Sequence, residues 1–591
     1  MTKARALALL MLVVFLATSF RKGWTRHETD FPNYYTAAVL VRRGAPLRDY
    51  YDWTWFQRQM HYAGIRGQLG SYLPQTPLTM LPIAPIAKFS VQTAKQIWLV
   101  LNLVFLATTL WTLSNATQIR TEHIAILMFL GYGSLQSNFR LGQYYVFLLF
   151  LLTLAYYCLE RGKSTTSGFL CGVAFGLKLY GGPFLLYFVV KRNWKAVAGM
   201  LAASALAVVT AIALFGWGDV HFYATQILPR CLEGEVIDPY NAANGTLTTL
   251  LRHSFVMESD LNPHPLSNVP VVFFFLRTFT ALLILGYTLF GLASEPRDFC
   301  RRGFAWFTIA ILLLSSNAAP YTYILLLLPV TLLLQPAGPK ERIYLIASYV
   351  ALNFLLLPSW VRFFPKLCIL FALYLVAGRH YWRALRPEIV AGGLLAAMII
   401  APLDAVGHLT RYRLEPNRHF QRLAVDRGTY LSTYPVVTSA GLFYQAMVRS
   451  GYVLRWSHDG RMEEFAFGGQ VFHPVAPSFV GPIYFELVKD GASTTMMFDP
   501  GTRKAVPAPP PQVTTERSVV SPDGKWIAFE SMQAGAKQIW LRDTVSGKAG
   551  VALGGDCNNS SPVWEDSHSL IFASDCGRGL GMPVLYRANI P

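Results

Sequence analysis

Long apolar runs separated by short polar segments dominate the first 406 residues of the chain. Clear runs lie at 4–20, 96–113, 144–158, 197–215, 270–292, 304–316, 321–336, 343–358, 361–378 and 389–405, and shorter or interrupted ones at 75–87, 123–137 and 167–190. A helix needs about 20 apolar residues to cross roughly 30 Å of hydrocarbon. The pattern therefore predicts a polytopic α-helical membrane protein with about twelve or thirteen transmembrane helices.

The composition supports this class, because 53% of the 591 residues are hydrophobic and only 14% are charged. That is too apolar for a soluble enzyme of this size, and the chain is long enough for two domains. The first run follows Lys3 and Arg5, a basic start that a secretory signal peptide would also have. Since the following "ATSF" is a loose match to a cleavage site, we take residues 4–20 as the first transmembrane helix.

Basic residues gather in short loops between the apolar runs, which is the positive-inside pattern. They are Lys191, Arg192 and Lys195; Arg297, Arg301 and Arg302; Lys340 and Arg342; and Arg379, Arg383 and Arg386. Residues 216–269, the second outer loop, are acidic by comparison. If residues 167–190 form one span, the N-terminus lies inside. Residues 21–74 (the first outer loop, itself basic) and the tail, which is the part of the chain after the last apolar run, then lie outside. The net charge of +18 then reflects the basic loops that orient the chain in the membrane, and no nucleic-acid partner is expected.

The tail carries a repeat with a period of 41 to 44 residues. The segments "LFYQA", "IYFEL", "IAFES" and "LIFAS" begin at residues 442, 483, 527 and 570, and each is followed by a second short strand. Such a period with Asp-Gly turns is typical of propeller blades. "SPDGKWIAFES" resembles the WD-like repeat of TolB-type β-propellers. We expect a linker at 407–429 and an all-β, propeller-like domain at 430–591, either a binding module or a structural cap.

Two cysteines of this tail, Cys557 and Cys576, are expected in an oxidising compartment, which would permit a disulfide. The sequence alone leaves their pairing open.

Asp30 follows the first apolar run directly and is surrounded by aromatic residues, prolines and arginines. The local sequence allows a purely structural interpretation, in which Thr29 or Asp30 caps a helix that begins at Pro32. An acidic side chain just outside a membrane span is also a candidate catalytic group.

The segments "DFPNYYTAAVLVRRGAPLRDYYD", "YLPQTPLTMLPIAPI", "AKQIWLVLNL", "NFRLGQYYVFLLFLLTLA", "GFLCGVAFGLKLYGGPFLLYFVVKRNWK" and "SSNAAPYTYILLLLPV" follow one another along residues 1–400. In this order they resemble glycosyltransferase family 87, polytopic enzymes of the GT-C superfamily. The resemblance implies a GT-C-type domain over residues 1–406 in a bacterial inner (plasma) membrane, with the C-terminal domain on the periplasmic side. The chain departs from the family pattern at Tyr144, where Asn or Asp is usual after Gly-Gln.

The resemblance also implies a reaction, in which a sugar moves from a polyprenyl phosphate to an extracytoplasmic acceptor with inversion. Asp30 would act as the general base on the acceptor hydroxyl, which is worth about 10²- to 10⁴-fold. The donor sugar would be mannose or a pentose, and the acceptor a glycan, a lipid or a protein. No cofactor is expected beyond the lipid-linked sugar, and we assign no metal site, because no histidine pair has the spacing of one.

The leaving phosphate needs a cationic partner. Lys178 is the first candidate, because a lysine inside an apolar span is a functional hypothesis by default, although snorkelling to the interface would also explain it. Arg140 is a second candidate, with Asn138 and Gln143 as hydrogen-bonding residues that otherwise cap or bridge helix ends. Further substrate-binding candidates are Tyr34 and Tyr321.

Aromatic residues of the first outer loop, Tyr34, Tyr35, Trp53 and Trp55, would suit stacking on sugars, or else form an interfacial belt. Two other functions stay open. A transporter or lipid flippase would show charges along a midplane pathway and inverted repeats, and a non-catalytic scaffold would only display the propeller-like domain.

Overall fold

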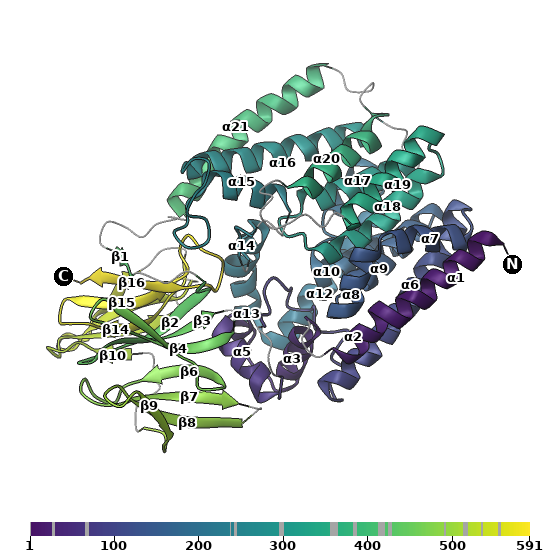
Figure 1. The fold of residues 1–591 in the computed structure, drawn as a ribbon. Coiled ribbons are helices and arrows are strands. Elements are labelled where there is room, and N and C mark those ends of the chain that lie inside the picture. The colour runs from purple at the N-terminus through teal and green to yellow at the C-terminus, as the bar shows by residue number, and fades with distance from the viewer. Residues whose placement is uncertain are drawn as a thin grey trace.

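The computed structural model describes residues 2–26, 30–65, 70–236, 238–241, 245–294, 301–354, 364–381, 387–411, 420–423, 428–448, 450–489, 492–511, 518–532, 536–553 and 557–590. Helices occupy the first part, up to Arg411, and strands the second, from Phe420 onward (Figure 1). The predicted fold class, a polytopic helical membrane part followed by an all-β domain, is confirmed, and the propeller-like form of that domain stays a prediction. Helix α21 (Pro387–Arg411) and strand β1 (Phe420–Arg422) both extend into the predicted linker at 407–429.

Five helices in the described part of the chain are long and apolar enough to cross a membrane. They are Lys3–Thr25, which joins α1 (Lys3–Phe15), the π-helical η1 (Leu16–Phe20) and α2 (Arg21–Thr25); α6 (Val91–Thr117); α12 (Trp194–Phe215); α16 (Pro270–Ala293); and Val390–His408 within α21. The sequence predicts about twelve or thirteen spans because it counts apolar runs of some 15 residues. In the structure most of these runs are shorter helices.

Several of the shorter helices are halves of broken ones. Helices α8 (Tyr132–Leu141) and α9 (Tyr145–Glu160) meet at a bend of 118°. Helices α10 (Ser164–Lys178) and α11 (Phe184–Val190) are two halves of the predicted span at 167–190. Other short helices around them are α7 (Thr121–Leu130), α17 (Arg301–Leu314), the 3-10 helix η4 (Pro320–Leu326), α18 (Leu327–Leu334), α19 (Pro339–Phe354) and α20 (Pro365–Gly378).

The apolar run at 75–87 is not a helical span, contrary to the prediction. It forms successive turns between Gln75 and Phe89. The cause is its prolines at 74, 77, 82 and 85, each of which removes an amide donor that an α-helix would need.

The outer loops contain the remaining helices. These are α3 (Phe31–Arg42), α4 (Leu47–Tyr50) and α5 (Trp53–Tyr62) in the first outer loop, and α13 (Trp217–Phe222), η2 (Tyr223–Ile227), α14 (Leu228–Leu232) and α15 (Leu247–Phe255) in the second.

Small residues hold α10 close to α12. Gly168, Gly172 and Gly176 recur every fourth residue on α10 and face the small residues Ala196, Ala203 and Ala207 of α12. A Cβ atom at Gly168 would collide with the backbone of Ala196. Small residues at this spacing allow helix backbones to approach closely in a membrane. The contact fixes the position of α10, whose last residue is Lys178.

The second part of the chain consists of four antiparallel four-stranded sheets. Their strands are β2 (Leu431–Thr438), β3 (Gly441–Val448), β4 (Gly451–His458) and β5 (Arg461–Phe465); β6 (Gln470–Val475), β7 (Ile483–Lys489), β8 (Ala492–Asp499) and β9 (Lys504–Pro507); β10 (Ser518–Val520), β11 (Trp526–Ser531), β12 (Gln538–Asp543) and β13 (Ala549–Leu553); and β14 (Asn559–Trp564), β15 (Ser569–Ser574) and β16 (Val584–Asn589) with β1. The repeat of 41 to 44 residues therefore corresponds to one sheet per unit.

Strand β1 precedes all the repeats but completes the last sheet, where it pairs antiparallel with β16. A disulfide joins Cys557 and Cys576 in the same unit, which answers the question that the sequence left open.

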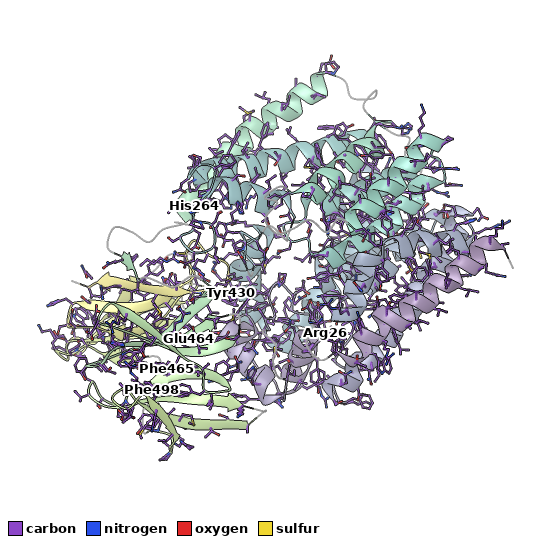
Figure 2. All side chains as sticks on the ribbon, in the orientation of Figure 1. Arg26, His264, Tyr430, Glu464, Phe465 and Phe498 are labelled. Atoms are coloured by element: carbon purple, nitrogen blue, oxygen red, sulfur yellow. A yellow bond between two sulfur atoms is a disulfide. The ribbon has the colours of Figure 1, made fainter. Side chains whose placement is uncertain are left out.

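The propeller-like domain packs on both outer loops through a set of buried charges. The Arg578 side chain is fully buried and pairs with Glu258 at 3.2 Å and Asp260 at 2.9 Å. Arg422 pairs with the same two carboxylates. Arg578 also donates to the carbonyl of Tyr430, which Figure 2 shows on the side of the domain that faces the helices. The three segments predicted outside the membrane therefore meet in space.

A second buried cluster of ion pairs between the two parts of the chain lies on α14. Arg230 pairs with Glu235 at 2.8 Å and with Asp575 of the propeller-like domain at 3.0 Å. On the first outer loop, Lys537 pairs with Asp52 at 2.9 Å and Tyr62 donates to Glu486 at 2.6 Å. The two parts of the chain are thus joined over a broad polar and apolar surface.

Replacing Arg578 with methionine tests how much this contact stabilises the protein. Glu258 and Asp260 would lose one of two cationic partners while staying buried, so Arg578→Met is expected to lower the free energy of unfolding by about 3 kcal/mol. Arg587→Met is the matched control, because Arg587 pairs with Glu565 at the half-exposed surface of the same domain and should cost at most about 1 kcal/mol. Urea titrations followed by tryptophan fluorescence measure both, and equal losses would contradict the prediction.

Candidate active site

Asp30 stands at the start of α3, one residue before Phe31. It occupies the position of a helix cap, but its side chain makes no capping hydrogen bond. Instead, Asp30 Oδ2 accepts a hydrogen bond of 2.5 Å from Nε2 of Gln143. The helix begins one residue earlier than the predicted start at Pro32. The carboxylate of Asp30 is thus directed toward α8 and α9 rather than onto its own helix, and Thr29, the other predicted cap, lies outside the described residues.

Gln143 orients this carboxylate. It lies in the break between α8 and α9, where Gly142 has a φ of +70° that ends α8. Its Oε1 accepts a hydrogen bond of 2.7 Å from the Tyr34 hydroxyl, so its amide nitrogen is left to face Asp30. The indole nitrogen of Trp98 donates to its carbonyl at 3.3 Å. These contacts fix both ends of the Gln143 side chain and, through it, the carboxylate.

Lys178 is the last residue of α10, and its ammonium group is turned into the protein. Nζ donates to Gln75 Oε1 at 2.5 Å and lies 3.5 Å from the Tyr34 hydroxyl. It also sits 5.4 Å from the ring centroids of Tyr34 and Tyr145. Among the residues that the structure describes, no carboxylate forms an ion pair with Lys178. A cation held by neutral groups in this way is able to receive an anion.

The chain stops being helical directly after Lys178, because Leu179 has a φ of +61°. The free carbonyl groups at the end of α10 are capped from the turn segment at 75–87. Thr76 Oγ1 donates to the carbonyl of Gly176 at 2.6 Å, and Thr79 Oγ1 to that of Leu177 at 2.7 Å. The same segment therefore ends the helix and supplies Gln75 to Lys178.

A cavity of about 330 Å³ opens beside Lys178. Its walls come from α9, α10, α11, α14, α16 and α17, and are mostly apolar, with Leu186, Leu285, Phe307 and Ile311 among them. The polar end is formed by Lys178 and the segment 315–317. The cavity thus combines one cationic end with a long apolar surface.

Asn138 and Tyr321 lie next to this site and contact each other. Asn138 Nδ2 donates to the carbonyl of Tyr321 and to that of Ser134, both at 2.8 Å. It thereby links α8 to η4. The Tyr321 ring packs on Tyr145, 5.1 Å between centroids. Both residues hold together the elements that surround Lys178, and their contact with a substrate stays a prediction.

Arg140 lines a different cavity from Lys178. Its exposed side chain faces a space of about 290 Å³ that it shares with Lys22, Thr25 and Arg26 at the end of the first membrane helix. Figure 2 shows Arg26 among the helices of the first part. The structure therefore separates the two predicted phosphate-binding cations.

Sequence reasoning missed several residues of the site. Gln75, Tyr145 and the two threonines of the turn segment touch or support Lys178. The signal was present in "YLPQTPLTM", where polar residues interrupt an apolar run. Lys95 was also missed: it is a second buried lysine in a span, and its ammonium donates to the carbonyl of Arg26 at 2.9 Å.

Tyr144, where the chain departs from the family pattern, is buried and packs on Tyr34 and Trp98 at ring distances of 4.5 and 4.8 Å. It supports the Tyr34–Gln143 contact from behind. Among the described residues, no three His, Cys, Asp or Glu side chains come together as ligands for a metal ion.

Burial raises the pKa of Asp30 above its ordinary value of 3.8. The hydrogen bond from Gln143 and the charges of Lys178, Lys95 and Arg26 stabilise the ionised form and oppose this shift. The environment therefore gives a carboxylate of raised basicity that stays oriented for proton transfer.

Comparison with known proteins identifies one region of the helical part. Residues 74–317 match the model of glycosyltransferase family 87. The matched region contains Gln143, Asn138, Arg140 and Lys178, whereas Asp30, Tyr34 and Tyr321 lie outside it. The match supports a membrane glycosyltransferase. No curated protein matches the sequence.

Among solved structures, the chain is similar to TolB from Acinetobacter baumannii, with 12% identity and a TM-score of 0.14. The similarity covers 28% of this chain and 44% of that one. The chain thus spans less than half of that protein.

Removing the amide of Gln143 tests the electrostatic arrangement around Asp30. Gln143→Leu deletes a hydrogen bond that favours the ionised form, so the pKa of Asp30 is expected to rise further. Difference infrared spectroscopy of the carboxyl band during a pH titration measures this, with Asp30→Asn as the reference that assigns the band. Gln136→Leu, on the preceding helix α8, should leave the titration unchanged, and an unchanged pKa in Gln143→Leu would contradict the assignment.

Proposed function

We propose, on the premise that residues 74–317 are a glycosyltransferase family 87 region, that the protein transfers mannose or a pentose from a polyprenyl phosphate to an acceptor outside the membrane. Asp30 is the general base and Lys178 the partner of the leaving phosphate. The observation that carries the proposal is that an oriented, partly buried carboxylate is linked through Gln143 and Tyr34 to a lysine at the polar end of a mostly apolar cavity.

The reaction follows from these two groups. Asp30 accepts the proton of the acceptor hydroxyl, and the oxygen attacks the anomeric carbon of the donor. The bond from that carbon to the phosphate oxygen breaks on the opposite face, the phosphate keeps the electron pair, and the sugar configuration inverts. Lys178 neutralises the charge that develops on the phosphate. Holding the two substrates in line supplies much of the remaining acceleration.

The cavity beside Lys178 suits a lipid donor in particular. A polyprenyl phosphate has one anionic group attached to a long apolar chain, and the cavity has one cationic end and apolar walls. Tyr34 and Gln143 connect Lys178 to Asp30 by hydrogen bonds of 3.5, 2.7 and 2.5 Å. The sugar would then lie between the phosphate and the base, next to these polar groups.

The Asp30→Asn variant tests the general base. Asparagine keeps the shape of the side chain but cannot accept the proton, so transfer is expected to fall at least 100-fold, within the range of roughly 10²- to 10⁴-fold for acid–base catalysis. The assay uses protein in lipid nanodiscs, radiolabelled polyprenyl-phosphate sugars and membrane extract as the acceptor, with released polyprenyl phosphate as the readout. Asp459→Asn, at an exposed turn of the propeller-like domain, is the control, and full activity of Asp30→Asn would exclude the role.

The pH dependence of kcat/KM tests the same group in the wild type. Only ionised Asp30 accepts a proton, and burial raises its pKa above 3.8. The value of kcat/KM should therefore be constant at high pH and fall as the pH drops through that raised pKa. An acid limb at or below 3.8 would mean that another group limits the reaction.

The Lys178→Met variant tests the phosphate site. Methionine fills a similar volume without the charge, so binding of polyprenyl phosphate is expected to weaken by roughly 10- to 100-fold, as for the loss of a charged hydrogen bond. Lys163→Met, at the exposed opposite end of α10, is the matched control. Product inhibition by added polyprenyl phosphate measures the effect. Equal inhibition of the two variants would show that the phosphate does not bind at Lys178.

A further inference from the structure

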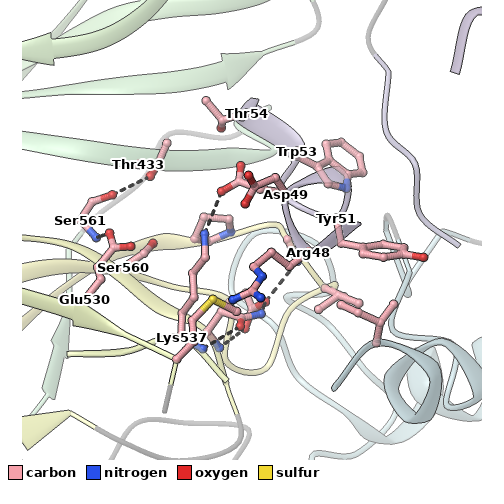
Figure 3. A pocket seen from close by; sticks show the side chains of 18 of the residues that line it. Arg48, Asp49, Tyr51, Trp53, Thr54, Thr433, Glu530, Lys537, Ser560 and Ser561 are labelled. Carbon is pink, nitrogen blue, oxygen red and sulfur yellow. Dashed lines mark hydrogen bonds and ion pairs between the residues drawn. The ribbon is translucent and has the colours of Figure 1, made fainter. Parts of the chain in front are cut away.

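We propose that a polar pocket between the first outer loop and the propeller-like domain binds a neutral saccharide. The pocket has a volume of about 80 Å³, room for several water molecules. Tyr51 and Trp53 line it from the first outer loop, and Thr433, Glu530, Ser560 and Ser561 line it from three different sheets of the propeller-like domain (Figure 3). The role of the saccharide as part of the acceptor rests on the proposed function, whereas its binding does not.

Three ion pairs surround this pocket, and the carboxylates of Asp49 and Glu530 also line it. Arg48 pairs with Asp219 at 2.6 Å, Lys537 pairs with Asp52 at 2.9 Å, and Asp575 pairs with Arg230 at 3.0 Å. Figure 3 shows the lysine reaching across to the first outer loop. A phosphate or another anion would have to compete with these pairs and would also meet two further carboxylates. A neutral ligand would not, in contrast to the cavity at Lys178.

The polar groups that remain are those that bind hydroxyl groups. Thr433, Ser560 and Ser561 each present a hydroxyl that can donate and accept. Thr433 and Ser561 lie 3.3 Å apart, and the Glu530 carboxylate accepts from the Ser561 amide at 2.7 Å (Figure 3). Sugars offer many donors and acceptors at close spacing, which such a set satisfies.

The backbone is distorted where the pocket lies. Strands β2 and β14 carry bulges, between Thr433 and Val436 and between Ser560 and Val563. In each bulge one non-glycine residue has a positive φ, +52° at Tyr434 and +53° at Ser561, and both residues line the pocket. Bulges and left-handed residues of this kind are costly and gather at functional sites. The same distortion recurs on β6, with a bulge between Phe472 and Val475 and a φ of +50° at His473, so it belongs to the repeat. At β2 and β14 it places Tyr434 and Ser561 at the pocket.

Trp53 supplies an unpaired donor. It is 7% exposed, and its indole nitrogen has no hydrogen-bond partner. It lies beside Gly581, where a Cβ atom would come within 3.4 Å of that nitrogen and 2.9 Å of Cδ1. The absence of a side chain at Gly581 lets its backbone pack directly against the indole. A ligand hydroxyl that accepts from this nitrogen would satisfy it, and the ring would cover the apolar face of a sugar.

The pocket shares a wall with the candidate active site. The Tyr51 hydroxyl donates to the carbonyl of Gln75 at 3.1 Å, and the side chain of Gln75 accepts from Lys178 at 2.5 Å. Two side chains therefore separate the saccharide pocket from the predicted phosphate site. A sugar unit bound here would belong to an acceptor glycan held next to the reaction centre.

The test is direct binding to the full chain in nanodiscs, measured by saturation-transfer NMR with the methyl glycosides of mannose, arabinose and galactose, and with mannose 6-phosphate. At least one neutral glycoside should bind more tightly than the phosphorylated sugar. Trp53→Phe removes the indole donor and keeps an aromatic ring, so binding should weaken about five- to tenfold. Ser560→Ala, from the other wall, should also weaken it.

Trp540→Phe is the matched control, because Trp540 has another buried indole nitrogen without a partner but does not line the pocket. It should bind as the wild type does. Asp30→Asn should bind normally as well, even where it loses transfer, which separates this inference from the proposed function. Absence of binding by every neutral glycoside, tighter binding of mannose 6-phosphate, or unchanged binding in both Trp53→Phe and Ser560→Ala would overturn it.

Discussion

The candidate active site depends on helices that stop in the interior of the helical part. Inside a membrane protein, a backbone that leaves the helix must find other partners for its free amide and carbonyl groups, so such breaks occur only where protein or a cavity surrounds them. Here the breaks after Leu141, after Lys178 and before Pro320 lie together. Threonine hydroxyls, an asparagine amide and an indole nitrogen satisfy the freed carbonyl groups. Gln143, Lys178 and Tyr321 are consequently held at helix ends, where side chains can converge on one point.

The contact between the two parts of the chain rests on a different balance. Buried Arg578 and Arg230 lose their hydration, and the carboxylates of the second outer loop offset that loss. Pairs of this kind add less to stability than to the precision of docking. Because each pair has one fixed geometry, the propeller-like domain is held against the first outer loop. Asp52, Tyr62 and Trp53 of that loop contact the domain there. That placement creates the saccharide pocket.

The sequence was sufficient for the class of fold, and it named several residues that the structure brings together around Asp30 and Lys178. Apolar runs predicted helices, and the period of 41 to 44 residues predicted one sheet per repeat. Asp30 and Lys178 stood out because charges are rare beside or within apolar runs. Gln75 did not stand out, since a polar residue among prolines has no periodicity to mark it. The pairing of β1 with β16 was equally hidden, because three residues far from the repeats carry no signal of their own.

Strand β1 has a consequence for the order in which this protein matures. It leaves the ribosome before every other strand of its domain, yet its partner β16 is made 162 residues later, counted from Arg422 to Val584. During that interval β1 lacks β16, its partner strand, whereas the helical part has already been synthesised. The last sheet, the disulfide and the charges at 575–578 that dock on the second outer loop all come together only when the final repeat is complete. The contact between the two parts of the chain is therefore completed late, and a chain that ends before β16 would contain the candidate active site without the complete last sheet.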